Sequence, residues 1–277
     1  MSDDWDHGDL YGRGPDERPR DRKIDAAKAA LMQTYFAGGT NVYYARQLEI
    51  WQEKTFFHWI TSRALRELAG ERRIGFSEGT SGTRRAHFYF PIRHRYPRRQ
   101  IAQTLNLIGE FSVPLFTRAL GHYGEMLLES GLARTGFRIL EHKVKEVDGR
   151  AWTKTNHDLD FLIIRDGIRY GVEVKNQLGY IDQTEFQIKL AMCEHFGIRP
   201  MFVTRVLPKN YIYEVANAGG FSLLTDNQNY PLLADDLARR VRAALNLPVG
   251  VIERFPDTAL LRFERWHEQQ GKAEDSV

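Results

Sequence analysis

Near the middle of the chain, polar and hydrophobic residues alternate in the pattern of a β-strand that buries one face. Asp158 and Asp160 point to one side of this strand, because side chains along a strand alternate with a period of two. The opposite side carries three hydrophobic residues, Leu159, Phe161 and Ile163. Residues 165–168 have the composition of a tight hairpin turn. A second strand is therefore predicted to follow and to pair antiparallel with the first.

Helical spacing of hydrophobic residues predicts a long helix upstream of these strands, over residues 116–136. Its buried stripe consists of Leu120, Tyr123, Leu127, Leu128 and Leu132. Glu125 stands near the edge of that stripe, from which it could lean toward the hairpin. Downstream, a helix is predicted over residues 183–196, with short β-runs at 199–205 and 221–225. This alternation of strands and helices predicts an α/β fold with a mixed sheet.

The N-terminal third has a different pattern. Hydrophobic spacing predicts three helices, over residues 24–36, 42–50 and 54–71. Two β-runs follow, at residues 73–77 and 86–90, with a turn at 78–82 between them. Three helices and a hairpin resemble a winged helix-turn-helix domain, here over residues 24–97. In such a domain the third helix enters a major groove and the hairpin touches phosphate. Winged helices also serve as protein-docking or dimer modules, so that alternative stays open.

The remaining segments complete the predicted domain order. Residues 98–115 are expected to form a connecting helix, and residues 116–270 a second domain. Within that second domain, helical spacing also predicts helices at residues 232–247 and 256–270. The two ends of the chain are predicted to be disordered tails, residues 1–23 and 271–277, since the first mixes acidic residues with Arg, Gly and Pro and lacks apolar periodicity.

Charge supports contact with nucleic acid through local patches. The chain of 277 residues has a net charge of only +3. Attraction to nucleic acid must therefore come from local basic patches and not from the field of the whole protein. Residues 84–99 contain six arginines and no Asp or Glu, a composition that favours phosphate contacts. A solvated basic loop is the alternative interpretation. The candidate DNA-binding residues are Lys54, Thr55, His58, Arg63, Arg84, Arg85, Arg93 and Arg95.

Cysteine content and hydropathy favour a cytoplasmic location. The single cysteine, Cys193, excludes a disulfide within the chain and fits a reducing compartment. Cys193 and His195 alone make a weak case for a metal site. No apolar run approaches the roughly 20 residues of a membrane span, and the polar N-terminus lacks the hydrophobic region of a signal peptide. We therefore expect no membrane association.

The candidate chemistry lies on the two central strands. Glu173 and Lys175 share a face of the second strand, and pairing can bring Asp160 beside them. Two carboxylates can hold Mg²⁺, which prefers oxygen ligands, with Mn²⁺ as a substitute. The carbonyl of Val174 is a further candidate ligand. Lys175 would orient or help to deprotonate a water, or neutralise charge in the transition state of diester hydrolysis. A buried strand that ends in an ion pair is the alternative interpretation.

Together these motifs resemble the PD-(D/E)xK nuclease superfamily over about residues 116–226. The resemblance implies an αβββαβ core with a mixed central sheet, and a site formed by Glu125, Asp160, Glu173 and Lys175. No proline precedes the aspartate, and Asp158 is a possible substitute for Asp160. Some members place a substrate-contacting glutamine on the helix after the second strand, where this chain has Gln183 and Gln187. Of these two, Gln187 is favoured, and a solvent-facing glutamine is the alternative.

The combined interpretation is an Mg²⁺-dependent DNA endonuclease with a winged-helix domain that binds duplex DNA. The resemblance implies a restriction-like or defence role most readily. A double-strand cut takes two sites, so a homodimer is expected, and an activating partner protein could gate the activity. Two other classes stay open: a non-catalytic DNA-binding regulator, and a structure-selective nuclease that acts on junctions, single strands or RNA.

Overall fold

The computed structural model describes residues 22–82 and 84–274 and divides into two compact units. Unit 1 comprises the chain up to Phe116 together with Arg239–Leu247, and unit 2 comprises Thr117–Ala238 and the chain from Pro248. Of the two predicted tails, residues 1–21 and 275–277 lie outside the described residues, whereas residues 271–274, predicted as disordered, belong to a helix. Within the described residues, no helix is both long enough and apolar enough to cross a membrane.

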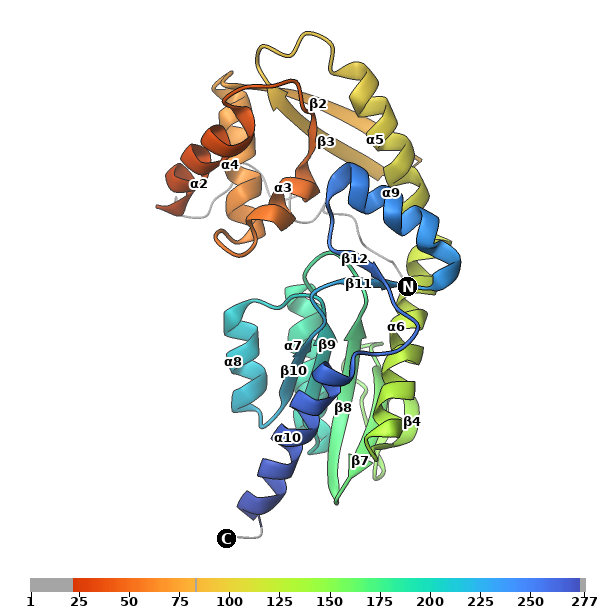
Figure 1. The fold of residues 1–277 in the computed structure, drawn as a ribbon. Helices are drawn as coiled ribbons and strands as arrows, with labels where there is room; N and C mark the ends of the chain where they lie inside the picture. Colours follow the sequence, from red (N-terminus) through yellow and green to blue (C-terminus); the bar gives the residue numbers. More distant parts are fainter. Residues whose placement is uncertain (1–21, 83, 275–277) are drawn as a thin grey trace. The chain divides into compact units, whose positions relative to one another are not determined.

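Unit 1 is a small helical bundle packed on a three-stranded antiparallel sheet of order β1-β3-β2 (Figure 1). Its elements in chain order are α2 (Lys23–Leu31), the π-helix η1 (Met32–Phe36), β1 (Tyr43–Tyr44), α3 (Ala45–Gln52), α4 (His58–Gly70), β2 (Ile74–Ser81), β3 (Arg84–Pro91) and α5 (Arg98–Phe111). Leu31, Leu48 and Leu65, from three different helices, are fully buried in its core. This order of helices followed by a hairpin is the one that the sequence pattern predicts.

Three local predictions for unit 1 were wrong. The helix predicted at residues 54–71 begins only at His58, and Lys54 and Thr55 lie in a turn before it. The helix predicted at residues 42–50 begins only at Ala45, because Tyr43 and Tyr44 are extended and pair with β3. Residues 78–81, predicted as a turn, belong to strand β2. Gly79 lies so close to Leu105 of α5 that a Cβ atom would stand 2.5 Å from its Cδ1. The glycine that suggested a turn therefore serves close packing of a helix on the strand.

Unit 2 is built on a five-stranded mixed sheet of order β10-β9-β8-β7-β4, which confirms the predicted α/β fold class. Strands β4, β7 and β8 are antiparallel neighbours, whereas β8, β9 and β10 run parallel. The elements that form and cover this sheet are α6 (Pro114–Arg134), β4 (Arg138–Val144), β7 (Leu159–Arg165), β8 (Ile168–Lys175), α7 (Gln183–Phe196), β9 (Arg199–Thr204), α8 (Lys209–Asn217), β10 (Phe221–Leu224) and α10 (Asp257–Glu274). The succession from α6 to β9 has the order helix, three strands, helix, strand.

Smaller elements complete the chain. They are the hairpin strands β5 (Glu146–Val147) and β6 (Arg150–Ala151), the parallel pair β11 (Gln228–Tyr230) and β12 (Val249–Val251), the 3-10 helix η2 (Leu232–Ala234) and α9 (Asp235–Leu245). The C-terminal part of α9 and the next residues as far as Leu247 belong to unit 1. There the Leu245 carbonyl accepts a hydrogen bond from Gln47 Nε2 at 3.0 Å, and Arg240 pairs with Glu110.

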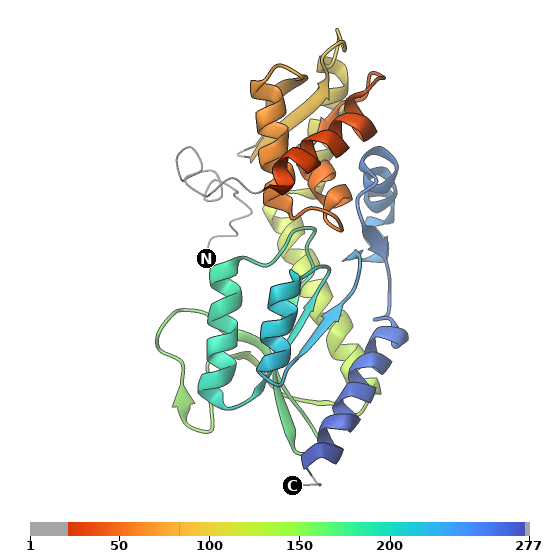
Figure 2. The ribbon, with the colours of Figure 1, turned by 90° about the vertical axis from the view of Figure 1, so that its left-hand side faces the viewer.

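Helices cover both faces of the unit 2 sheet (Figures 1 and 2). Helices α6 and α10 pack on one face, where Leu128 and Phe263 join a buried cluster with Val172 of β8. Helices α7 and α8 pack on the other face, where α7 contributes Phe186 and Met192 to two further clusters. Each face of the central strands therefore meets a different pair of helices. This separation decides which helical side chains can reach the polar residues of β7 and β8.

Strand β4 is not evident from the sequence pattern, because it forms an edge of the sheet. Most of its residues are exposed, and a bulge between Ile139 and Glu141 interrupts its register with β7. Exposed edge strands carry charged residues and irregularities that discourage pairing with other chains. The period-two hydrophobic pattern that reveals β7 is consequently missing from β4.

The predicted hairpin turn between β7 and β8 is confirmed, with Asp166 at φ +49° and Gly167 at φ +79°. Positive φ at both central residues is the geometry of the two-residue hairpin turn that favours Asp-Gly. Gly167→Ala is expected to destabilise the protein by about 1 kcal/mol, because L-residues with a Cβ are strained in this region. Urea unfolding would measure the change.

Gly121→Ala is the matched control for this substitution. Gly121 lies within helix α6, and a Cβ there would meet nothing within 4 Å. Alanine in a helix interior is more stable than glycine by about 0.5–1 kcal/mol, so this variant should gain stability. A loss of stability in Gly121→Ala equal to that in Gly167→Ala would contradict the assigned turn conformation.

Candidate functional site

Strands β7 and β8 separate where the polar residues of the two strands stand. Their ladder ends at the pair Phe161 and Val172. Beyond this pair β8 remains hydrogen-bonded only to β9, with Glu173 opposite Phe202. At the split, the Asp160 side chain replaces the backbone contact between the strands: its Oδ2 accepts a hydrogen bond from the Val174 amide at 2.7 Å. Alternation along β8 thus directs Glu173 to the face covered by α7. The prediction for Leu159 was wrong, because it packs on this face and not with Phe161 and Ile163 on the other.

Glu173 is buried between two ammonium groups. Lys175 Nζ lies 2.9 Å from Glu173 Oε1, and Lys189 Nζ lies 2.5 Å from Oε2. Lys175 also pairs with Glu185, at 2.7 Å. The side chains form an ion-pair chain of alternating sign that runs Glu185, Lys175, Glu173, Lys189. The two members at its Lys189 end are enclosed, with Glu173 2% and Lys189 4% exposed.

These contacts set the protonation of the site. Burial, together with the neighbouring charge of Glu173, raises the pKa of Asp160 well above its ordinary value. Burial alone would also raise the pKa of Glu173, but Lys175 and Lys189 outweigh it and the pKa is lowered. Burial opposes the charge on Lys175, yet Glu173 and Glu185 raise its pKa above the usual value. Lys175 therefore stays a cation at neutral pH.

Of the predicted site residues, the structure brings together Asp160, Glu173, Val174 and Lys175. Glu125 lies outside this group, on α6, and its carboxylate stands 3.5 Å from His122 Nδ1. In the part of the chain that the structure describes, no three His, Cys, Asp or Glu side chains come together in a way that could hold a metal ion.

Gln187 and Asp158 also have other partners. Gln187 lies on α7, and its Nε2 donates a hydrogen bond to Glu214 of α8 at 2.6 Å. Asp158 contributes its backbone carbonyl, which accepts a hydrogen bond from Lys189. Neither side chain joins the ion-pair chain, in contrast to Glu185 on the same helix as Gln187.

Two members of the ion-pair chain, Glu185 and Lys189, were not predicted. They are four residues apart on α7 and therefore share a face of the helix. A signal for Lys189 exists in the sequence. It stands three residues after Phe186 and four before Cys193, in a stripe of otherwise hydrophobic residues that is buried in the structure. A lysine at such a position needs a charged or polar partner, because burying an unpaired charge is costly.

Asn176 anchors the end of β8 beside the site. Its Nδ2 donates to the carbonyls of Leu120 and Asn229, each at 2.7 Å. Its Oδ1 accepts from the Asn229 amide at 2.7 Å, and its own carbonyl accepts from Gln228 Nε2. Gly124 of α6 permits this approach, since a Cβ there would stand 2.6 Å from Asn176 Cβ. The residue after Lys175 is thus held by α6 and β11 together.

The available donors fit a divalent cation that prefers oxygen. Asp160 and Glu173 supply two carboxylates, and Mg²⁺ is commonly held by one or two carboxylates with water. Val174 directs its amide toward Asp160, and in a strand the carbonyl of a residue points to the same side as its amide. A cation at this place would have to share Glu173 with two lysines.

The candidate DNA-binding residues lie in unit 1, between α3 and α4, on α4, and on β3 with the segment that follows it. Five of them are exposed: Lys54, Thr55, Arg85, Arg93 and Arg95. His58, Arg63 and Arg84 are half-buried. Two have acidic neighbours, since Arg63 Nε lies 3.2 Å from Glu67 and Arg85 Nε lies 3.7 Å from Glu78. Tyr96, within the arginine-rich residues 84–99 that we call the basic segment, is 82% exposed.

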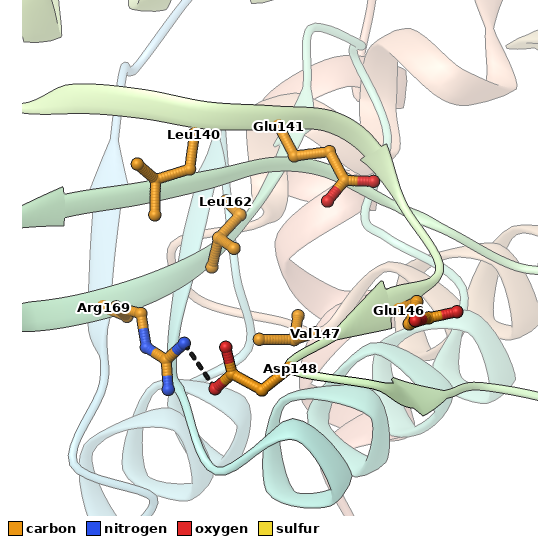
Figure 3. A pocket seen from close by; sticks show the side chains of 7 residues that line it. All are labelled: Leu140, Glu141, Glu146, Val147, Asp148, Leu162 and Arg169. Atoms are coloured by element: carbon orange, nitrogen blue, oxygen red, sulfur yellow. Dashed lines mark hydrogen bonds and ion pairs between the residues drawn. The ribbon is translucent and has the colours of Figure 1, made fainter.

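A hollow of about 420 Å³ lies elsewhere on unit 2, along the edge strand β4 and the hairpin β5–β6 (Figure 3). Its floor includes Leu162, and Arg169 pairs with Asp148 at 2.7 Å across it. None of the ion-pair chain residues lines this hollow. It is therefore separate from the site on β7 and β8.

Comparisons with known proteins add little. No model of a known protein family matches the sequence, and no curated protein matches it. One solved structure, described as "Structure of EndoMS-dsDNA2 complex", is similar at 14% sequence identity with a TM-score of 0.28. The match covers 37% of this chain and 43% of that chain, less than half of either. A likeness this distant carries no argument about fold or function.

Proposed function

We propose that this chain is a metal-dependent endonuclease that hydrolyses phosphodiester bonds of duplex DNA. The observation that supports the proposal most is the convergence of Asp160, Glu173 and Lys175 at the split between β7 and β8. Two carboxylates that repel each other and an ammonium beside them suit a reaction on a negatively charged diester. The two central strands place these groups by their pleat, on rigid elements of the fold.

Each residue of this group has its own proposed role in hydrolysis. Asp160, Glu173 and the Val174 carbonyl would hold Mg²⁺ or Mn²⁺. The bound cation would supply a lowered water pKa and stabilisation of charge on the phosphate oxygens. Because the pKa of Lys175 is raised, we assign Lys175 to orienting the water and neutralising phosphate charge, and not to proton removal. The roles predicted for Glu125 and Gln187 remain predictions.

The surface of unit 1 supports duplex DNA as the substrate. Exposed cations on β3 and the following segment can contact phosphates without regard to sequence. Replacing Arg93 and Arg95 together by alanine should weaken DNA binding and reduce the slope of log affinity against log salt by about 2, close to 0.9 for each phosphate that the protein no longer neutralises. Electrophoretic mobility shifts at several salt concentrations would measure both quantities.

Arg242→Ala is the control for this double substitution. Arg242 is exposed on α9, in the part of that helix that belongs to unit 1, but it lies outside the basic segment. Its removal should leave the salt slope unchanged. Equal effects of the two variants would mean that binding follows net charge alone and not this segment.

A non-catalytic DNA-binding protein is the second candidate. It is favoured by one observation, namely that both carboxylate oxygens of Glu173 already lie against ammonium groups. In that case the ion-pair chain would only stabilise unit 2. A defence role, a cytoplasmic location, a homodimer and an activating partner remain predictions.

Cleavage itself distinguishes the two candidates. The full chain would be incubated with supercoiled plasmid and with linear duplex, in Mg²⁺, in Mn²⁺ and in EDTA. We expect nicked or linear products with either metal and none with EDTA. Single-stranded and branched DNA and RNA would be run beside them, since preferential cutting of one of these would move the proposal to a structure-selective nuclease. DNA binding without cutting under every condition would favour the non-catalytic protein.

A further inference from the structure

We propose that Lys189 is a built-in counter-ion that keeps the affinity of the Asp160 and Glu173 pair for divalent cations low. The inference rests on the proposed function, in that it takes this pair to be the cation site. Lys189 acts through Glu173 and is a positioning residue. Its 4% exposure leaves no surface on which DNA could contact it.

The contacts of Lys189 join the two strands that carry the carboxylates. Its Nζ lies 2.5 Å from Glu173 Oε2 on β8. The same ammonium donates a hydrogen bond to the carbonyl of Asp158, two residues before Asp160 in the sequence. One buried positive charge therefore fixes Glu173 relative to the start of β7. A divalent cation that binds both carboxylates must compete with it for Glu173.

The two lysines of the ion-pair chain differ in their freedom to move. The side chain of Lys175 is 23% exposed, so it can swing toward solvent when a cation or a phosphate arrives. Lys189 is enclosed in the stripe of α7 that also buries Phe186 and Cys193. It has no exposed position to which it could retreat. Its ammonium group consequently stays beside Glu173 while this packing is intact.

The charge balance gives the direction of the effect. When all groups are ionised, the carboxylates of Asp160, Glu173 and Glu185 exceed the two ammonium groups by one negative charge. Without the charge of Lys189, the excess is two negative charges. A positive charge held beside a carboxylate opposes the binding of a divalent cation to that carboxylate, and it does so more strongly in the protein interior than in water. We therefore expect at least about a tenfold gain in cation affinity without Lys189.

The test measures Mn²⁺ binding to the full chain without DNA, by titration calorimetry and by the electron paramagnetic resonance signal of free Mn²⁺. Lys189→Met, which keeps a long unbranched side chain and removes the charge, should bind Mn²⁺ at least about tenfold more tightly than the unsubstituted protein. Lys189→Gln, which is also uncharged but keeps a hydrogen-bond donor, should show the same gain and replaces the methionine variant if that one does not fold. Lys189→Arg, which keeps the charge, should stay near the original affinity.

Lys28→Met is the matched control. Lys28 is 7% exposed in unit 1, and it pairs with Glu67 and Glu71 as Lys189 pairs with Glu173. Its loss removes a buried, ion-paired lysine from a place remote in sequence from the site, so Mn²⁺ affinity should not change. Structural damage in general would lower cation affinity, whereas the inference requires a gain that is specific to Lys189.

The outcomes separate this inference from the proposed function. Unchanged or weaker Mn²⁺ binding in folded Lys189→Met or Lys189→Gln protein overturns the inference. If Asp160→Asn nevertheless abolishes binding in the same experiment, the cation site of the proposed function still stands. If the original protein and Asp160→Asn bind Mn²⁺ equally, the cation site itself is wrong and both ideas fail.

Discussion

Asp160→Asn protein is expected to lose DNA cleavage by more than about 100-fold while it still folds and still binds DNA. Loss of partners that only orient metal ligands already costs about 10–100-fold, and Asp160 is proposed as a ligand itself. Asparagine has the same shape and can still accept the hydrogen bond from the Val174 amide. The fold at the split between β7 and β8 should therefore survive the substitution.

The stability of this variant should be equal to or above that of the original protein. The pKa of Asp160 is raised in the folded state, so at neutral pH its charged form opposes folding. Asparagine removes that charge next to Glu173. Functional sites commonly hold such destabilising groups because the chemistry needs them. Thermal unfolding without metal would show an unchanged or higher midpoint.

Plasmid nicking rates and mobility shifts would measure the two activities of Asp160→Asn side by side. Asp166→Asn is the control, because Asp166 lies in the turn of the same hairpin and asparagine tolerates its positive φ. That substitution removes one carboxylate charge away from the ion-pair chain, and cleavage should remain near its original rate. Cutting by Asp160→Asn at the rate of Asp166→Asn would remove the basis of the proposed site.

Asn176→Ala is expected to lower the free energy of unfolding of unit 2 by about 2–4 kcal/mol. The side chain of Asn176 makes three hydrogen bonds, to the Leu120 carbonyl and to both backbone groups of Asn229. Alanine leaves these groups buried without their partner, and each unsatisfied buried group costs about 1–3 kcal/mol. A small cavity between α6, β8 and β11 adds to this cost. Urea unfolding followed by circular dichroism would measure it.

Asn156→Ala provides the comparison for Asn176. Asn156 is exposed and accepts one hydrogen bond, from Lys145 Nζ at 2.8 Å. Its replacement should change stability by no more than about 0.5 kcal/mol. Similar losses in the two variants would show that the buried network around Asn176 contributes no more than a surface contact does.

The strands and their turn could be predicted because their signals are local. The alternation around Asp160 assigns side chains to faces by the pleat alone, and Asp166 with Gly167 has the composition that a two-residue turn requires. Local signals were misleading where packing or strand pairing with residues distant in the sequence decides the conformation. Gly79 suggested a turn but lies in a strand against Leu105, and Tyr43 and Tyr44 were predicted as helix but pair with β3.

The sequence by itself therefore determined the α/β class, which follows from the succession of predicted helices and strands. It also determined the β7–β8 hairpin and the meeting of Asp160, Glu173 and Lys175, because these follow from spacing along one short segment. Only the tertiary structure decided which helix reaches that group. Helical periodicity shows that α6 and α7 each have a buried stripe, but it cannot say which face of the sheet each stripe covers. Packing of α7 on the face of Glu173 brings in Glu185 and Lys189, whereas α6 covers the opposite face and leaves Glu125 beside His122.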